Sequence, residues 1–260
     1  MNKTGIPYLD YCINPVIMRC SFTGCPTRDT CWHLGFCKRM ANNPKIPLRY
    51  QEIYLGKRPP VLDQERLEQT LKIRNPSRIG IQFMGDLFDE QVKQKWVDEI
   101  FFVIKPTSQH QYFILTKQVT RMAQWRFDTD ILGGGDWYRN IFFGITVTSQ
   151  TDADRMIPDL LRIPGKHWLS IEPLMEGPID LSEWLFMDGI GILDFINFCV
   201  VGCHNHPSKY PCELSWIEDI VRQCRAAGVP CYVKQIPIGG KVCRDISKFP
   251  ATVAVREWPK

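Results

Sequence analysis

The sequence predicts an α/β fold in which parallel strands alternate with helices, arranged as a partial or complete barrel of about six or seven β/α units. The first observation is that short apolar runs typical of strands recur along the chain, with helix-like patterns between them. The second is the length, because 260 residues suit one large domain and an α/β barrel fills about this length alone. We therefore expect a single domain over residues 1–260.

The predicted strands and helices follow one another in a regular order. The strands are expected at Tyr8–Met18, Arg78–Met84, Gln111–Leu115, Asn140–Val147, His167–Ile171, Asp194–Val201 and Pro230–Val233. Apolar residues near helical spacing predict helices at Gln91–Ile104, Ala153–Leu161 and Ser215–Ala227. In the last helix we expect Ser215 as the N-cap and Gly228 just past the end. Strand and helix in alternation indicate parallel strands joined by right-handed crossovers.

Composition and charge exclude several classes of protein. The chain is 44% hydrophobic and 23% charged, which is typical of a globular domain and not of a disordered or fibrous one. No apolar run reaches the roughly 18 residues of a membrane helix, and Met1–Asp10 lacks the apolar region of an export signal. We therefore expect a cytoplasmic protein without a membrane partner. The net charge of +4 is too small to indicate a nucleic-acid partner by itself.

The cysteines are the most informative residues. There are 11, an odd number, and a cytoplasmic chain keeps its thiols reduced, so no disulfide framework is expected. Five precede residue 38: Cys12, Cys20, Cys25, Cys31 and Cys37. The last four have loop-forming neighbours such as Gly24 and Pro26, so residues 19–38 are predicted to form a loop that binds a metal or a cluster.

Polar residues follow the predicted strands where each strand ends. In an α/β barrel the chemistry sits at this edge, so we expect one site built from several strand ends. The polar residues concerned are Asp86 and Asp89, Thr116 and Lys117, Thr146 and Thr148, Ser170 and Glu172, Cys203 and His204, and Lys234 and Gln235.

A family resemblance rests on motifs spread over about residues 8–250. The N-terminal part contains Asn14-Pro15 before Cys20, then Gly24-Cys25, then Cys31-Trp32-His33. The others are Phe83–Phe88, Phe113–Lys117 with Arg121-Met122, Gly144–Val147 with Gln150, Ser170–Leu174, Cys224–Pro230 and Lys234-Gln235. In combination they resemble the phage and bacterial three-Cys-motif proteins, a family of unknown function with a radical-SAM-like organisation.

Apart from Trp32, which follows the third cysteine where the family has tyrosine, the chain departs from this family in two places. Five residues separate Cys25 from Cys31, where the family usually has two, so either Cys31 or Cys37 completes the set. Strand six ends in Gly202-Cys203-His204-Asn205, where the family tends to show Gly-Gly-Glu-Ser. The second departure indicates a different substrate or an additional metal ligand.

The resemblance implies a radical SAM enzyme with a TIM-type barrel. Cys20, Cys25 and Cys31, with Cys37 as substitute or fourth ligand, would hold a [4Fe-4S] cluster with one open iron. An electron donor would reduce the cluster, S-adenosylmethionine would be cleaved, and the 5′-deoxyadenosyl radical would abstract hydrogen from an unknown substrate. From their positions, we expect cofactor contacts from Gly85, Asp86, Lys117, Thr146, Thr148 and Glu172, and catalytic roles for Lys117, Glu172 and Lys234.

Two further features bear on ligands. Cys203, His204 and Cys212, with His206 and Cys243 nearby, form a loosely spaced candidate for a second metal site. Residues 38–78 contain ten Lys or Arg and four Asp or Glu, and the basic excursion 42–78 includes Tyr50 and Tyr54. Basic residues with aromatic residues are typical of nucleic-acid binding, so a nucleic acid or nucleotide is one candidate substrate, beside a peptide or metabolite.

Other functions remain open from the sequence. One is a non-catalytic zinc module that closes Cys20, Cys25, Cys31 and Cys37 into a four-thiolate site and contacts nucleic acid. Another is a redox iron–sulfur protein that does not use SAM. A nucleophilic enzyme using Cys203 and His204 is disfavoured, because adjacent residues on an extended chain point apart.

Overall fold

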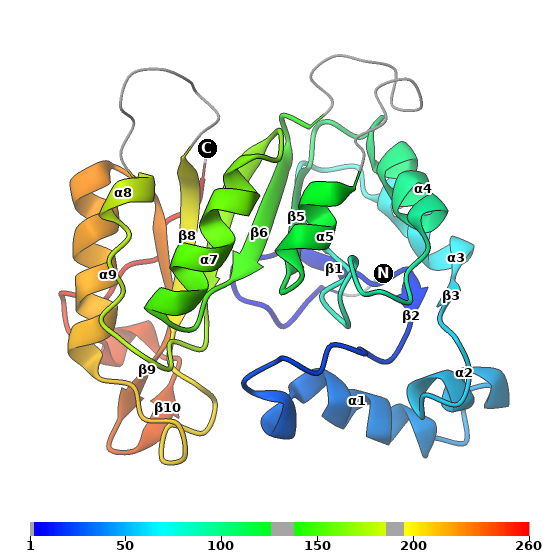
Figure 1. Ribbon diagram of the computed structural model, residues 1–260, viewed down its shortest axis with the longest axis horizontal. Coiled ribbons are helices and arrows are strands. Elements are labelled where there is room, and N and C mark those ends of the chain that lie inside the picture. The colour runs from blue at the N-terminus through cyan, green and yellow to red at the C-terminus, as the bar shows by residue number, and fades with distance from the viewer. Residues whose placement is uncertain (1–2, 126–137, 186–194, 260) are drawn as a thin grey trace. The chain divides into compact units, whose positions relative to one another are not determined.

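The computed structural model describes residues 3–125, 138–185 and 195–259 (Figure 1). The chain divides into two compact units, Met1–Asn140 and Ile141–Lys260. Each unit contains parallel strands and the helices that connect them.

The first unit contains a parallel sheet of three strands in the order β1-β4-β5. These strands are β1 (Tyr11–Ile13), β4 (Arg78–Ile81) and β5 (Gln111–Thr116), and a separate antiparallel pair is formed by β2 (Val16–Ile17) and β3 (Val61–Leu62). Its helices are α1 (Trp32–Ala41), α2 (Leu48–Tyr54), α3 (Gln64–Leu67), α4 (Gln94–Ile104) and α5 (Val119–Gln124). Side chains of β4 and β5 are buried on both faces, as in parallel sheets covered by helices.

The second unit contains the strand order β6-β7-β8-β9-β10. The strands β6 (Ile141–Thr146), β7 (Lys166–Ile171), β8 (Ile196–Gly202) and β9 (Cys231–Ile238) are parallel, and β10 (Lys241–Cys243) pairs antiparallel with β9. The helices are α7 (Gln150–Leu161), α8 (Ser182–Leu185) and α9 (Leu214–Ala227). In this unit α7 packs against β6, and α9 packs against β8 and β9 (Figure 1).

The predicted α/β class with mostly parallel strands is confirmed, but the predicted barrel is not confirmed. Neither unit closes its described strands into a barrel, and β10 ends the second set with an antiparallel hairpin. Helix α9 ends at Gly228, which has φ +67°, as expected for a C′ glycine. The predicted N-cap is wrong: Glu213 caps α9, and Ser215 lies inside the helix with its hydroxyl on the Glu213 carboxylate. Among the helices described, none is long and apolar enough to cross a membrane.

An ion pair joins the start of β1 to the start of β4 and makes stability depend on pH. The Asp10 carboxylate accepts hydrogen bonds from the Arg78 backbone N (2.8 Å), Nε (3.1 Å) and Nη2 (3.0 Å). These bonds hold the pKa of Asp10 below its ordinary value of 3.8. The ionised carboxylate therefore stabilises the folded state above pH 3.8, and this contribution is lost as pH falls through the lower folded-state pKa.

We expect Asp10→Asn to lower the free energy of unfolding at pH 7 by less than about 1 kcal/mol, because the Asp10 side chain is 37% exposed. The difference between the wild type and the variant should shrink as the pH falls from 5 to 2, as measured by urea unfolding at each pH. Arg155→Ala, which removes an exposed arginine from α7, is the control for loss of a surface ion pair. A difference that grows at low pH would contradict this account.

Candidate functional site

The carboxyl ends of β1 and β4 are joined by the amide side chains of Gln82, which is buried, and Asn14, which is half-buried. Gln82, directly after β4, is fully buried with φ +56°, and its side chain bonds the backbone N and O of Val16 (both 2.9 Å). Asn14 Oδ1 accepts from the backbone N of Met84 (2.7 Å). The Asn14-Pro15 motif and the segment after β4 are therefore one hydrogen-bonded unit.

Gly85 lies where the backbone passes closest to the segment that leads into the cysteine loop. It has φ +107°, and a Cβ at this position would lie 2.6 Å from Met18 Sδ. Met18 is buried, two residues before Cys20. The glycine is required both by its backbone conformation and by this close approach.

Asp86 is buried, and its carboxylate binds groups of its own chain. Thr116 Oγ1 lies 2.7 and 2.9 Å from its two oxygens, and the backbone N of Lys117 and Phe88 donate at 3.0 and 2.9 Å. Burial raises the pKa of Asp86, and these hydrogen bonds oppose the shift. The carboxylate thus positions the backbone at the end of β5, including Lys117, a predicted site residue.

Asp89 anchors the cysteine loop to the segment that follows β4. It is fully buried and accepts from the Ser21 backbone N (2.8 Å) and hydroxyl (2.7 Å). It also accepts from the backbone N of Gln91 (3.1 Å). Because Ser21 follows Cys20, this carboxylate determines where the loop begins.

The loop presents three half-buried thiols without disulfides, from Cys20, Cys25 and Cys31. Burial, with smaller contributions from Asp89, Asp86 and Cys31, raises the pKa of Cys20 to about 12. Cys31 is the residue before the first turn of α1. These thiols therefore come from one loop of the first unit, with two buried carboxylates beside Cys20.

Cys37 lies in a different environment from the other three. It is fully buried in the apolar cluster beneath α1, where its Sγ lies 3.5 Å from His33 Nε2 and 3.7 Å from Met18 O. Burial raises its pKa to about 11. His33 is also buried, which lowers its pKa to about 4, and its Nδ1 has no hydrogen-bond partner within the described residues.

In the second unit, the predicted site residues take part in one ion pair and in one pair of hydrogen bonds. Lys234 Nζ lies 2.7 Å from Glu172 Oε2, with side chains 22% and 12% exposed, so the ion pair is largely screened from water. The backbone N and hydroxyl of Thr148 donate to Asp152 Oδ2 at 3.1 and 2.7 Å, at the start of α7. Thr146 is buried at the end of β6.

The second predicted metal set consists of Cys203, His204 and Cys212. All three are buried; burial raises the pKa of both thiols to about 12, and His204 Nδ1 accepts from the His206 backbone N (3.0 Å). Across residues 3–125, 138–185 and 195–259, no group of three or more His, Cys, Asp or Glu side chains is arranged to hold a metal ion. This applies to the cysteine loop as well, so both metal sites stay predictions.

Two features of the second unit have no strong signal in the sequence. Cys224 of α9, Cys199 of β8 and Cys231 of β9 are all buried, and their thiols lie close enough to shift one another's pKa, so three thiols meet in the core. Apolar neighbours indicated burial of Cys199 but not the meeting of three elements.

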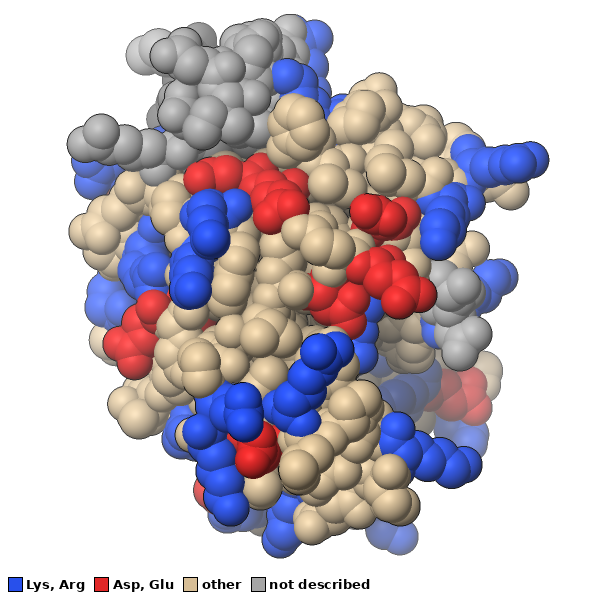
Figure 2. Space-filling view, turned by 90° about the vertical axis from the view of Figure 1, so that its right-hand side faces the viewer, with Lys and Arg blue, Asp and Glu red and all other residues tan. Residues whose placement is uncertain are grey.

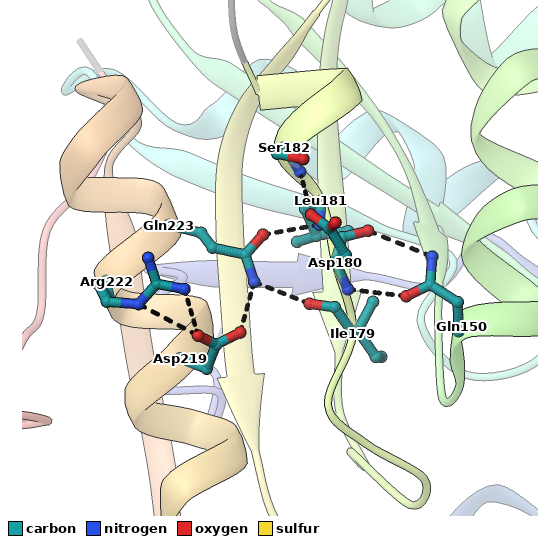
Figure 3. A network of polar contacts seen from close by, with 8 residues as sticks. All are labelled: Gln150, Ile179, Asp180, Leu181, Ser182, Asp219, Arg222 and Gln223. Carbon is teal, nitrogen blue, oxygen red and sulfur yellow. Dashed lines mark hydrogen bonds and ion pairs between the residues drawn. The ribbon is translucent and has the colours of Figure 1, made fainter.

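The second feature is a polar network that holds the segment before α8 (Figure 3). Gln223 accepts from the backbone N of Leu181 (2.7 Å) and donates to Asp219 (2.7 Å). Gln150 accepts from the backbone N of Asp180 (2.7 Å). Gln150, one of the motif residues, therefore has a structural role in joining α7 to this segment.

Fold and site together define an α/β protein with a cysteine-bearing loop anchored beside the carboxyl ends of parallel strands. The chain belongs to the family described as "Protein of unknown function (DUF5131)", whose model matches residues 3–257. No curated protein and no solved structure matches the chain. The match confirms an uncharacterised family, and the radical-SAM-like part of the resemblance stays a prediction.

Proposed function

We propose that this protein is a radical S-adenosylmethionine enzyme whose cluster is held by Cys20, Cys25 and Cys31. The observation that supports it is the loop itself: three free thiols whose first member is anchored, through Ser21 and Asp89, beside the end of β4. When bound, a [4Fe-4S] cluster supplies the electron that cleaves S-adenosylmethionine to a hydrogen-abstracting radical. An electron donor is the implied partner.

The donor set suits such a cluster. Three thiolates hold three irons and leave the fourth open for a second ligand. Cys31 is near enough to Cys20 to contribute to its raised pKa. His33, whose Nδ1 has no partner among the described residues, follows Cys31 by two positions. Cys37 suits the role less well, because its thiol belongs to the apolar cluster under α1.

The remaining predicted residues receive roles consistent with their contacts. Asp86 is a positioning residue, since its oxygens accept from Thr116 and from the Lys117 backbone. We assign Lys117 to the carboxylate of S-adenosylmethionine and Thr146 and Thr148 to its ribose. We assign the Glu172–Lys234 ion pair to proton transfer. A barrel-like arrangement of the strands is also part of the proposed enzyme.

The proposal is tested on protein purified without oxygen and reconstituted with iron and sulfide. We expect broad absorbance near ~400 nm, typical of thiolate-bound clusters. After reduction and addition of S-adenosylmethionine, we expect formation of 5′-deoxyadenosine. Colourless protein with one tightly bound zinc would contradict the proposed enzyme activity and favour the zinc module. A bound cluster without formation of 5′-deoxyadenosine would favour the redox iron–sulfur protein.

Single cysteine variants identify the ligands. Cys20→Ala, Cys25→Ala and Cys31→Ala are each expected to abolish 5′-deoxyadenosine formation and to lower the bound iron severalfold. Cys243→Ala is the matched control, because that half-exposed thiol lies on β10 and is not assigned to the cluster. Cys37→Ala should retain the cluster while lowering stability, and loss of all bound metal in this variant would exclude the three-thiol assignment.

A further inference from the structure

Helices α1 and α2 bury their apolar faces against each other and against β2. The buried cluster consists of Ile17, Cys37, Ala41, Ile53 and Tyr54, with further half-buried apolar residues packed around it. Because this packing uses most apolar residues of both helices, their outward sides are mostly polar and charged. Trp32 and Leu48 are the exposed large apolar residues of the two helices.

The outward side carries a set of positive charges that we call the cationic face: Lys38, Arg39, Lys45, Arg49 and Lys57, all exposed. The acids nearby have other partners, since Glu52 pairs with Arg58 and Asp63 pairs with Arg66. In the described part of the chain, no ion pair involves any of the five cations. Figure 2 shows a group of Lys and Arg side chains close together in the lower part of the view, with an acidic side chain among them.

An exposed aromatic ring lies at the edge of the cationic face. Trp32 is 55% exposed and directly follows Cys31 at the start of α1. Gly35 and Arg39 follow on the same side of the helix, since residues three to four apart are neighbours. A Cβ on Gly35 would lie 3.8 Å from Arg39 Nη1, so this guanidinium extends back along α1 toward the turn that carries Trp32.

We propose that the cationic face binds single-stranded nucleic acid, with phosphates on the cations and a base stacked on Trp32. Exposed cations that no described acid pairs with, beside an exposed aromatic ring, supply the two interactions that hold single strands. Of the five, Arg49 also lies over the ring of Tyr50. An anionic membrane suits the face less well, because most apolar residues of α1 and α2 belong to the buried cluster and only Trp32, Leu48 and Leu55 are exposed large apolar residues of this segment. This inference rests on the proposed function in naming its substrate class, although binding itself does not require the cluster.

The test is fluorescence anisotropy of the full chain with labelled 20-nucleotide single strands of DNA and of RNA, over a range of salt concentrations. We expect K38E/R39E/R49E to weaken binding at least tenfold and to lower the slope of log Kd against log salt by about 2, as expected when three phosphate contacts are lost. The control R155E/R162E/K248E makes the same charge change at exposed positions of the second unit and should change Kd less than twofold. Trp32→Ala should weaken binding about tenfold with an unchanged salt slope.

Three outcomes would overturn the inference. These are no binding to either oligonucleotide, an equal loss in the control variant, or binding only to phosphatidylserine vesicles. The radical activity is scored separately by 5′-deoxyadenosine. Oligonucleotide binding without 5′-deoxyadenosine would support this face and contradict the proposed function, whereas 5′-deoxyadenosine without oligonucleotide binding would do the reverse.

Discussion

Gly144→Ala is expected to lower the free energy of unfolding by about 3–5 kcal/mol, a large part of the stability of an ordinary domain. Gly144 of β6 pairs with Trp168 of β7, and a Cβ at Gly144 would lie 2.1 Å from Trp168 Nε1. The indole is fully buried and donates to the Phe142 carbonyl (3.2 Å). The added methyl must displace the ring, so it both overpacks the core and removes the partner of a buried N–H.

The measurement is chemical unfolding, with a double-mutant cycle to identify the clash. Trp168→Phe removes the indole N–H and the ring atoms nearest the new methyl, so the double variant should be less destabilised than the two single changes added together. Gly35→Ala is the control in the opposite direction, since this helical glycine has room for a Cβ. It should be neutral or stabilise by up to about 1 kcal/mol. Strictly additive effects would contradict the contact.

Asp89→Ala is expected to release the cysteine loop and to lower stability by about 3 kcal/mol. The substitution removes both hydrogen bonds to Ser21 and the bond to the Gln91 backbone N, and it leaves these part-buried donors without the carboxylate. Hydrogen exchange of the Ser21–Cys31 amides should rise more than exchange in the second unit. If the loop is the cluster site, iron retained after reconstitution should fall severalfold.

Two variants separate the anchor from a general loss of stability. Ser21→Ala removes only the hydroxyl bond and should cost about 1 kcal/mol. Asp63→Ala removes a carboxylate that caps α3 and should cost a similar amount without affecting exchange in the loop. Two results would contradict the anchoring role. One is that Asp89→Ala leaves hydrogen exchange in the loop and the amount of bound iron unchanged; the other is that Asp63→Ala changes both as much as Asp89→Ala does.

The fold class was predictable because apolar periodicity is local. The runs later seen as β4 to β9 and the helices α4, α7 and α9 are visible as patterns of 4 to 14 residues, and the buried faces follow those patterns. Closure into a barrel was not predictable in this way. Closure depends on strand tilt and stagger, which are properties of the whole sheet and not of any one segment.

The candidate site was predictable in its residue types and not in its contacts. Position at strand ends identified Asp86, Asp89, Glu172 and Lys234 as candidate site residues, and their functional roles stay predictions. The hydrogen bonds of Asp86 to Thr116 and Lys117 join residues about 30 positions apart, which no local pattern records.

By itself, the sequence determined the parallel α/β class and the excess of basic residues in 38–78, because each depends on residue type and spacing along the chain. The predicted cysteine loop over 19–38 is wrong in its last part, since α1 begins at Trp32 and carries Cys37. Only the tertiary structure decided which of these cysteines lies in the core. Cys37 of α1 is buried, whereas Cys20, Cys25 and Cys31 are half-exposed. It also decided which basic residues form ion pairs. Arg58 and Arg66 pair with acids, whereas the five residues of the cationic face form no ion pair within the described residues. The physical reason is that burial and charge pairing depend on segments distant in the chain, which folding brings together.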